Sequence, residues 1–277
     1  MDYMAEKPAG IGSGTPSASA IDRMPRGGPD ASCLDRLLQT DRLEYLDRDS
    51  DSPSDAERKR SVIRALEMTG GWFGNTERFA EIALAEVEEV ADPKILELGA
   101  GHGGLSRTLL DWHPSAEATV TDVDPAAVAA MAAGDLGGHP RATVRAMDAT
   151  AIDAPDASFD LAVFALSFHH LPPAAAAQAM SEGTRVAGKL VIIDLPRPPS
   201  PLHLVRLATL LPLVPLLPFV HDGFISSLRS YSPSALRALA AYADPAIEVE
   251  LRGGLLSPQV VVAQRRTPDP LRPNGQR

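Results

Sequence analysis

Cysteine is almost absent from this sequence. Cys33 is the single cysteine in 277 residues, so the chain cannot form an internal disulfide. Proteins of oxidising compartments usually carry several cysteines, and we therefore predict a cytoplasmic location. Residues 1–20 also lack the basic segment followed by an apolar segment that marks a secretory signal, because Gly, Pro and Ser interrupt them.

Positive charge is scarce as well. The chain has 26 Lys and Arg against 36 Asp and Glu, a formal net charge of -10, and no run of basic residues offers a stripe that could follow a phosphate backbone. Binding to a phosphate backbone depends on clustered Lys and Arg. The composition therefore predicts that nucleic acid is not a partner.

Long apolar runs are missing with one exception, residues 201–220, PLHLVRLATLLPLVPLLPFV. The run is long enough to span a bilayer. However, Pro212, Pro215 and Pro218 would each remove a helix hydrogen bond, and His203 would lie in hydrocarbon. We therefore predict no transmembrane segment and interpret the run as an apolar lid or cap. Weak interfacial contact with a membrane is the second interpretation.

Changes of pattern along the chain predict four parts. Residues 1–30 are predicted to be a disordered arm, residues 31–92 a helical N-terminal cap, residues 93–266 one folded domain, and residues 267–277 a flexible tail. Within the domain, residues 201–243 are predicted to form an apolar cap insertion. A content of 44% hydrophobic residues is enough for a full core without disulfides.

Short apolar runs alternate with helical segments from residue 93 onward: KILELGA, ATVTDVD, ATVRAMDA, FDLAVFALS and KLVIIDLP. This alternation predicts a parallel sheet with helices on both faces. The last two runs, AIEVELRGGLL and PQVVVAQRR, are separated by a short turn region and must be antiparallel. The predicted fold class is α/β, a doubly wound, mostly parallel seven-stranded sheet with a terminal antiparallel hairpin and a helical cap.

The segment ILELGAGHGG, residues 95–104, satisfies two glycine patterns at the end of the first predicted strand. One of them, G-x-G-x-x-G, is the fingerprint of dinucleotide-binding folds, where the backbone approaches a pyrophosphate. Glu97 argues against an anionic ligand, because strand alternation places its carboxylate on the same face as Gly99 and Gly101. It favours a cationic nucleoside instead, and S-adenosylmethionine carries an ammonium and a sulfonium but no phosphate.

Two more acids stand at the ends of the next two predicted strands. Asp124 ends TVTDVD, where a carboxylate can accept from both hydroxyls of a ribose, and Asp148 ends VRAMD, where it can accept from the amino group of adenine. The backbone N-H of Ala149 is available for a ring nitrogen. Other roles stay open, because Asp124 precedes Pro125 and can cap a helix, and Asp148 can form a turn.

These segments, in this order, resemble the class I S-adenosylmethionine-dependent methyltransferases over residues 93–266. ILELGAGHG is similar to their first motif, VTDVDP to the second, MDAT to the adenine-binding motif and FDLAVFALSFHHLP to the fourth-strand motif. The resemblance implies that S-adenosylmethionine is the cofactor. The cofactor-binding residues that we predict are Glu97, Gly99, Ala100, Gly101, Asp124, Asp148, Ala149 and Ala165. Asp122 and the RVAGKL turn depart from the family pattern, which leaves the subfamily open.

The resemblance also implies methyl transfer to a small-molecule acceptor. The apolar cap favours a lipophilic or aromatic acceptor, and we predict an O-methyltransferase of specialised metabolism. A hydroxyl acceptor must lose its proton, and His170 and His221 are the candidate bases. Histidines at the positions of His169 and His170 are more often structural than catalytic, and His221 with Asp222 can equally serve to order its loop. Arg229 and Tyr231 are weaker candidates for orienting the acceptor.

Two alternatives remain at this stage. An NAD(P)-dependent oxidoreductase would need a Tyr-x-x-x-Lys pair after the fourth strand, and the one such pair is Tyr3 with Lys7. A catalytically inactive cofactor-binding partner subunit is the other alternative.

Trp72 and Phe73 are interpreted as anchors of the cap helices. The histidines have no metal-ligand spacing with cysteine or carboxylates, so we predict no metal. The sequence leaves the oligomeric state open.

Overall fold

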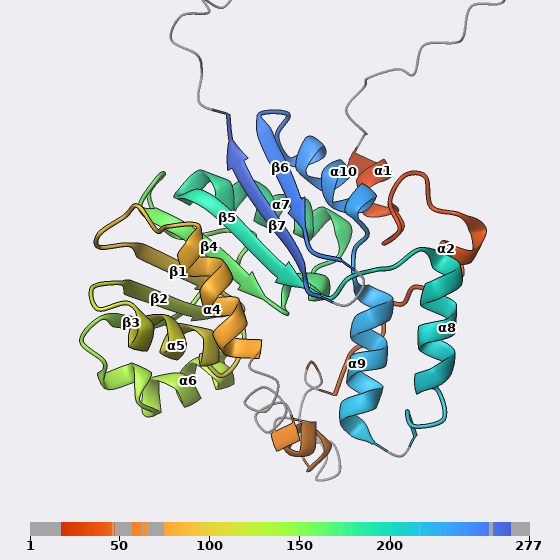
Figure 1. Ribbon diagram of the computed structural model, residues 1–277, viewed down its shortest axis with the longest axis horizontal. Helices are drawn as coiled ribbons and strands as arrows, with labels where there is room; N and C mark the ends of the chain where they lie inside the picture. The colour runs from red at the N-terminus through yellow and green to blue at the C-terminus, as the bar shows by residue number, and fades with distance from the viewer. Residues whose placement is uncertain are drawn as a thin grey trace, which may run out of the picture.

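A seven-stranded sheet forms the centre of the computed structural model, which describes residues 18–45, 47, 57–62, 64–65, 75–215, 217–254 and 257–266 (Figure 1). The strand order is β3-β2-β1-β4-β5-β7-β6. The strands are β1 Lys94–Leu98, β2 Glu117–Asp122, β3 Ala142–Ala146, β4 Phe159–Ala165, β5 Ala187–Asp194, β6 Ile247–Arg252 and β7 Gln259–Arg265. Strands β1 to β5 are parallel, whereas β7 is antiparallel to both β5 and β6. The predicted fold class is confirmed.

Helices cover both faces of this sheet. The helices of the described residues, both on these faces and beyond the ends of the strands, are α1 Ala18–Asp22, α2 Cys33–Leu37, α4 Asn75–Ala85, α5 Gly104–Trp112, α6 Pro125–Ala133, α7 Pro173–Val186, α8 Ser200–Leu210, α9 Pro218–Arg229 and α10 Pro233–Ala243, with short 3-10 turns η1 Leu136–Gly138 and η2 Phe168–His170. Helices α4 and α5 pack on one face, and α1, α7 and α10 on the other. Helices of both layers are visible around the sheet in Figure 1.

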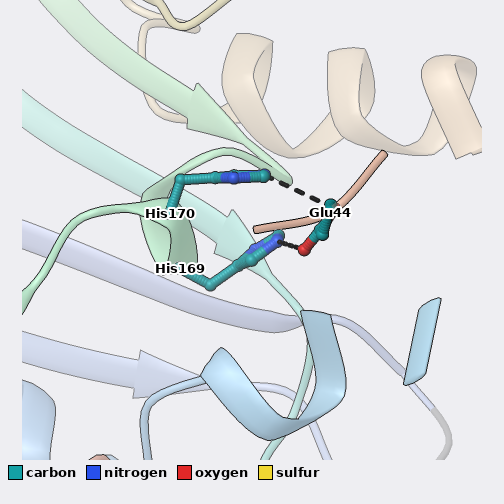
Figure 2. A group of neighbouring side chains, drawn as sticks. All are labelled: Glu44, His169 and His170. Atoms are coloured by element: carbon teal, nitrogen blue, oxygen red, sulfur yellow. Dashed lines mark ion pairs between the residues drawn. The ribbon is translucent and has the colours of Figure 1, made fainter. Parts of the chain in front are cut away.

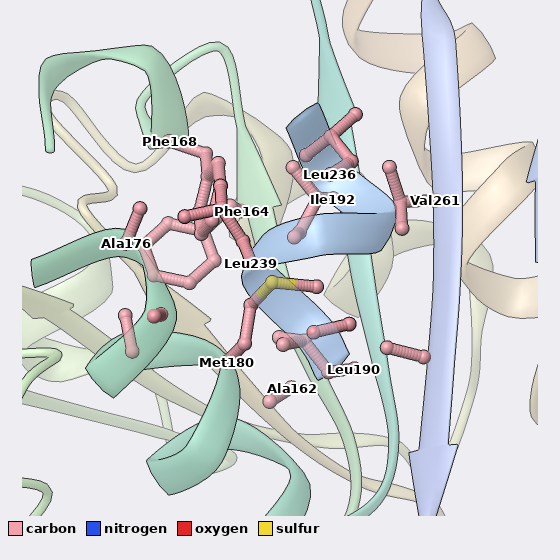
Figure 3. Close-up of a cluster of buried hydrophobic side chains, with 14 of the residues drawn as sticks. Ala162, Phe164, Phe168, Ala176, Met180, Leu190, Ile192, Leu236, Leu239 and Val261 are labelled. Carbon is pink, nitrogen blue, oxygen red and sulfur yellow. The ribbon is translucent and has the colours of Figure 1, made fainter. Parts of the chain in front are cut away.

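Both faces of the central strands are buried, which explains why these strands are nearly continuous apolar runs. Along β1, Ile95 packs with α4 and α5, whereas Leu96 packs on the opposite face with α7 and α10. Figure 3 shows part of the largest hydrophobic cluster, which includes Phe164 of β4, Leu190 of β5 and Met180 of α7. This packing fixes the carboxyl ends of the strands at one edge of the sheet.

Local signals in the sequence explain where several helices begin. The Asp124 side chain accepts a hydrogen bond from Ala126 N at 2.9 Å, and Pro125 occupies the first turn of α6. Ser232 caps α10 in the same way by accepting from Ala235 N at 3.1 Å. The helical segments that were predicted to alternate with the strands include α5, α6 and α7, which follow β1, β2 and β4.

The predicted disordered arm is wrong for residues 18–30. Ile21 and Met24 are buried in the core beside α7 and α10, with exposed fractions of 2% and 9%. Arg26 is also buried and donates hydrogen bonds to the backbone oxygens of His169 and Leu171. Two apolar side chains and one buried arginine are enough to dock this segment, although its overall composition is that of a disordered chain.

Two boundaries of the predicted caps are also wrong. Helix α4 was expected in the helical cap, but Phe79, Ala80 and Ala83 place it in the core against the sheet. Helix α10 was expected in the apolar insertion, but Leu236 and Leu239 pack with α7 on the other face. Both helices are amphipathic and short, so sequence alone did not show which apolar surface each one meets.

The apolar run from residue 201 forms part of α8, a turn and the start of α9, which lie side by side beyond the ends of β4 and β5 (Figure 1). Pro218 occupies the first turn of α9, where a proline costs little. Among the described residues, no helix is long and apolar enough to cross a membrane. Several apolar side chains stay exposed here, namely Leu202, Leu204, Val205, Leu211, Leu213 and Leu217.

Candidate functional site

The loop between β1 and α5 depends on glycine. Gly99, Gly101 and Gly103 have positive φ angles of 66°, 55° and 72°, which side-chain-bearing residues rarely adopt. A Cβ on Gly103 would lie 2.3 Å from the Leu136 side chain, whereas a Cβ on Gly101 would meet nothing within 4 Å. Gly103 is therefore required by packing, and Gly101 leaves an open space where a ligand can approach the backbone.

Asp122, which departs from the family pattern, organises this loop. Its Oδ2 accepts a hydrogen bond from Gly101 N at 2.8 Å, and its Oδ1 accepts from Asp124 N at 2.9 Å. One carboxylate at the end of β2 thus ties the glycine loop to the next loop. Sequence analysis assigned no role to Asp122, because its bond to Gly101 joins segments that become neighbours only in the parallel sheet.

Glu97 lies inside the protein, with an exposed fraction of 2%. Its carboxylate accepts from both the backbone N and the Oγ of Ser106 in α5, so it holds the start of this helix against β1. Burial raises the pKa of Glu97 to about 7, although the bonds from Ser106 act to lower it. The acid predicted to face the ligand is therefore poised between its neutral and charged forms.

The two acids at the next strand ends are exposed and already make turns. Asp124 caps α6 through Oδ1, while its Oδ2 lies 3.8 Å from Lys59 Nζ. Asp148 accepts from the backbone N and Oγ1 of Thr150 through Oδ1. The turn-forming roles left open for both residues are thus present. Neither role occupies both carboxylate oxygens, so binding of a nucleoside remains a prediction.

The end of β4 connects the glycine loop to a cleft. Ser167 Oγ donates to Leu98 O at 3.1 Å and lies 2.8 Å from the position that a Cβ on Gly99 would take. Between Ala165 and Ser167, Leu166 has a φ of 56°, a strained value for a residue with a side chain. Strain of this kind is concentrated at functional sites.

A cleft of about 510 Å³ opens at the ends of β4 and β5. Its walls are largely apolar, with Phe79 of α4, Leu166, Leu195, Pro196 and Leu202 of α8 among the residues that line it. Because Leu166 is adjacent to Ala165 and Ser167, the cleft begins directly beside the glycine loop. Its size and lining suit a small lipophilic molecule.

Polar groups gather close to this cleft around η2. His169 is buried, and its Nδ1 lies 2.7 Å from Asp194 Oδ1. His170 is half-buried, and its Nδ1 lies 2.9 Å from Asp47 Oδ1. Figure 2 shows Glu44 facing both rings, with Oε1 at 3.5 Å from His169 Nε2 and Oε2 at 3.9 Å from His170 Nε2. Burial lowers the pKa of His169, but the carboxylates of Asp194 and Glu44 raise it to about 9.

The remaining candidates for acceptor contacts are engaged with the protein. His221 Nδ1 lies 2.9 Å from Asp222 Oδ1. Arg229 is buried and contacts Asp47 at 2.6 Å, and Tyr231 donates its hydroxyl to Leu171 O at 2.7 Å. None of the histidines predicted as bases is among the residues that line the cleft. Trp72 and Phe73 lie outside the described residues.

The comparison with protein families decides between the methyl donor and the dinucleotide. Residues 95–189, from the glycine loop to the start of β5, match the family described as a methyltransferase domain. These residues therefore form a methyltransferase domain, as the glycine loop and the acids at the strand ends predict. The oxidoreductase alternative is thereby set aside, since the matched segment includes the disputed loop.

Several solved methyltransferase structures have the same fold as this chain. The methyltransferase is similar to the plantazolicin methyltransferase BpumL, solved in complex with SAH, with 13% identity over 78% of this chain and 92% of that chain, at a TM-score of 0.54. It is also similar to a Nostoc punctiforme protein assigned as an O-methyltransferase, with 18% identity over 73% of this chain and 59% of that chain, at a TM-score of 0.52. At these identities the likeness shows the fold. No curated protein matches the sequence.

The residues of the methyltransferase fit S-adenosylmethionine as its cofactor. The positive-φ glycine loop leaves open space at Gly101, and exposed carboxylates of Asp124 and Asp148 stand at the next two strand ends. Sequence reasoning missed Asp122, Ser106, Glu44 and Asp47 as members of the site region. One local signal could have revealed Asp122: an Asp side chain often accepts a hydrogen bond from the backbone N-H two residues later, here that of Asp124.

Proposed function

We propose that this enzyme transfers the methyl group of S-adenosylmethionine to a lipophilic or aromatic small molecule, as an O-methyltransferase of specialised metabolism. The apolar cleft beside the glycine loop is the observation that carries the proposal. An acceptor there would lie next to Leu166 and to Ala165, the residue at the end of β4 that the resemblance implies in cofactor binding. BpumL and the Nostoc protein, both named as methyltransferases, support the reaction class.

The donor would lie across the ends of β1, β2 and β3. In this proposal Gly99, Ala100 and Gly101 flank its methionine part, Asp124 binds the ribose through the oxygen not used for capping, and Asp148 with Ala149 binds the adenine. Each of these positions stands at the carboxyl end of a parallel strand, the edge where open α/β sheets bind their ligands.

Catalysis in this arrangement rests on proximity and orientation. The reaction is an in-line displacement at the sulfonium methyl, and a rigid cleft that aligns the acceptor supplies much of the rate. His170 and His221 are held by carboxylates away from the cleft lining, so the proposal gives neither of them the role of base. A phenol or another acidic hydroxyl is the acceptor class that needs the least help in losing its proton.

The test is a methyl-transfer assay with labelled donor and three acceptor classes: a hydrophobic phenol, an aliphatic amine and a hydrophilic hydroxy acid. Leu202→Asp places a charge in the cleft, whereas Leu204→Asp changes a similarly exposed leucine of α8 that does not line it. We expect transfer to the phenol, with KM raised about tenfold or more in Leu202→Asp, equivalent to about 1.4 kcal/mol. Leu204→Asp should retain the parent KM.

Transfer to the hydroxy acid alone, or equal effects of the two leucine substitutions, would contradict the lipophilic acceptor. Donor affinity measured by calorimetry serves as the control, because neither leucine belongs to the proposed donor site. A loss of donor binding in Leu202→Asp would show that the substitution disturbs more than the cleft.

A further inference from the structure

Glu44, His169 and His170 form a cluster that the proposed methyl transfer does not use. One potential ligand atom from each residue lies within 4.8 Å of the others (Figure 2). The two histidines are neighbours on η2, whereas Glu44 comes from the N-terminal segment after α2. Two imidazoles and one carboxylate converge on a single point between separate parts of the chain.

We propose that Glu44, His169 and His170 bind a divalent transition-metal ion with the preferences of zinc. In such sites the metal lies about 2.0 to 2.1 Å from each nitrogen and oxygen, which separates tetrahedral ligand atoms by about 3.3 Å. Glu44 oxygens lie 3.5 Å from His169 Nε2 and 3.9 Å from His170 Nε2. Small movements at the ends of the side chains would close these separations around an ion.

The opposite side of each imidazole ring is arranged as in known metal sites. Metal-binding histidines usually donate their second ring N-H to a carboxylate, which fixes the tautomer and turns the other nitrogen towards the metal. Asp194 occupies this position on His169 at 2.7 Å, and Asp47 occupies it on His170 at 2.9 Å. Both Nε2 atoms are thereby left for the side where Glu44 lies.

His169 Nε2 provides an independent indication of a ligand. The ring is 3% exposed, and within the described part of the chain this nitrogen has no hydrogen-bond partner. Its separation of 3.5 Å from Glu44 is an ionic contact and too long for a good hydrogen bond. A buried polar atom without such a bond is costly, and a metal ion at this point would satisfy it.

The charges around the cluster favour a cation. Three carboxylates contact the two rings, those of Glu44, Asp47 and Asp194, and Arg229 pairs with Asp47. Glu44 and Asp194 are both buried, and His169 lies between them as their shared ion-pair partner. A divalent ion beside Glu44 would take the place of the proton on His169 and leave both histidines neutral.

The donor set selects among metals. Imidazole nitrogens suit zinc, cobalt, nickel and copper, whereas Mg²⁺ and Ca²⁺ prefer sets made of oxygen. Two histidines and one glutamate leave at least one coordination position free, and His170 is half-buried, so a water or another small ligand has access. The ion would also link the Glu44 segment to η2, a role independent of the proposed acceptor.

The experiment uses the full chain without a histidine tag. The protein is treated with chelator, dialysed and titrated with Zn²⁺ by calorimetry, and Co²⁺ is added to a parallel sample to record visible absorption. We expect one Zn²⁺ bound per chain and a visible Co²⁺ spectrum typical of an ion with four or five ligands. Excess Mg²⁺ should not displace the bound Zn²⁺. Glu44→Gln and His170→Ala should each weaken Zn²⁺ binding about tenfold or more. His139→Ala, a histidine remote from the cluster, should bind as the parent does.

A second measurement on the parent protein does not depend on the folding of a variant. Diethyl pyrocarbonate modifies accessible imidazoles, and Zn²⁺ should protect His170 while leaving His139 reactive, as read by peptide mass spectrometry. The proposal fails if the parent binds no Zn²⁺, if Glu44→Gln and His170→Ala bind it as tightly as the parent, or if His170 is not protected. None of these readouts requires methyl transfer, so the two proposals fail separately.

Discussion

At the scale of single residues, the raised pKa of Glu97 would make binding at the proposed donor site depend on pH. Burial raises its pKa from 4.5 in the unfolded chain to about 7 in the folded protein. The folded state therefore loses stability as the pH rises from about 4.5 to 7, because the unfolded chain releases its proton first. A cationic ligand close to Glu97 would reverse this preference by stabilising the charged carboxylate.

The first prediction follows from that coupling. S-adenosylmethionine affinity should fall as the pH is lowered from 8 to 6, by up to about tenfold per unit below the pKa, with proton release on binding. In Glu97→Gln the affinity should be weaker by about 1 to 3 kcal/mol at pH 8 and should not depend on pH in this range. Calorimetry in buffers of different ionisation heat measures both quantities.

S-adenosylhomocysteine is the matched ligand for this experiment, because it keeps the ammonium and lacks the sulfonium charge. Its affinity should fall by an equal or smaller amount in Glu97→Gln. Parent-like donor binding by the variant at pH 8 would show that Glu97 only holds Ser106 in place.

The second prediction separates the two roles of Asp124. Asp124→Ala should weaken donor binding by about 1.5 to 3 kcal/mol and should also remove the cap of α6, which costs about 0.5 to 2 kcal/mol of stability. Asp124→Asn keeps a capping oxygen and loses the charge, so it should retain stability while donor affinity falls. Thermal melts and donor titrations distinguish these outcomes. Unchanged affinity in a folded Asp124→Ala protein would defeat the ribose assignment.

At the scale of elements, α1 is the shortest helix on the sheet and still contributes to the core. It has five residues, too few for a stable isolated helix, so packing must hold it. Ile21 lies against the core that contains α7 and α10, and Arg26 fastens the following turn to the loop after η2. The N-terminal segment thus supports the loop that carries His169 and His170.

The third prediction tests this packing. Ile21→Ala should lower the free energy of unfolding by about 2 to 4 kcal/mol, because it leaves a cavity under the helix. Asp22→Ala, on the neighbouring exposed position, should change it by less than about 0.5 kcal/mol. Denaturant melts of the two variants measure the difference. Equal stabilities of the two variants would show that residues 18–30 do not pack on the domain, as their composition predicts. Truncation of residues 1–28 is expected to destabilise the fold for the same reason.

At the scale of the whole molecule, the glycine loop, the apolar cleft and the cluster of Glu44, His169 and His170 lie at the carboxyl ends of the strands. Helices α8 and α9 stand beyond this edge and add Leu202 to the cleft wall. Since the donor binds the folded state, its presence should stabilise the entire domain.

The fourth prediction uses that linkage and needs no acceptor. Saturation with S-adenosylmethionine at about 100 times its Kd should add about 2.7 kcal/mol of stability and raise Tm by roughly 5 to 10 °C. NADH at the same concentration should leave Tm unchanged. A larger shift with NADH would overturn the choice of donor that the glycine loop and the family match support.

The sequence by itself determined the fold class, the strand order along the chain and the donor. These depend on local information: apolar runs that alternate with helices, glycines that need positive φ, and acids at strand ends, each readable within about ten residues. Even the cap of α6 was predicted, from Asp124 followed by Pro125. Such features are present in the sequence because backbone geometry demands them wherever they occur.

Only the tertiary structure decided which surfaces meet. Ile21 and Arg26 are buried against the domain, although their segment was predicted to be disordered. Helices α4 and α10 pack in the core, outside the predicted caps, and Glu44 lies beside His169 and His170. Sequence analysis predicted no metal from the spacing of histidines, cysteines and carboxylates along the chain. Glu44 is far from His169 and His170 in the sequence, so this spacing does not show that they are neighbours. Contacts between remote segments depend on the closure of the whole chain around its sheet, which no local pattern contains.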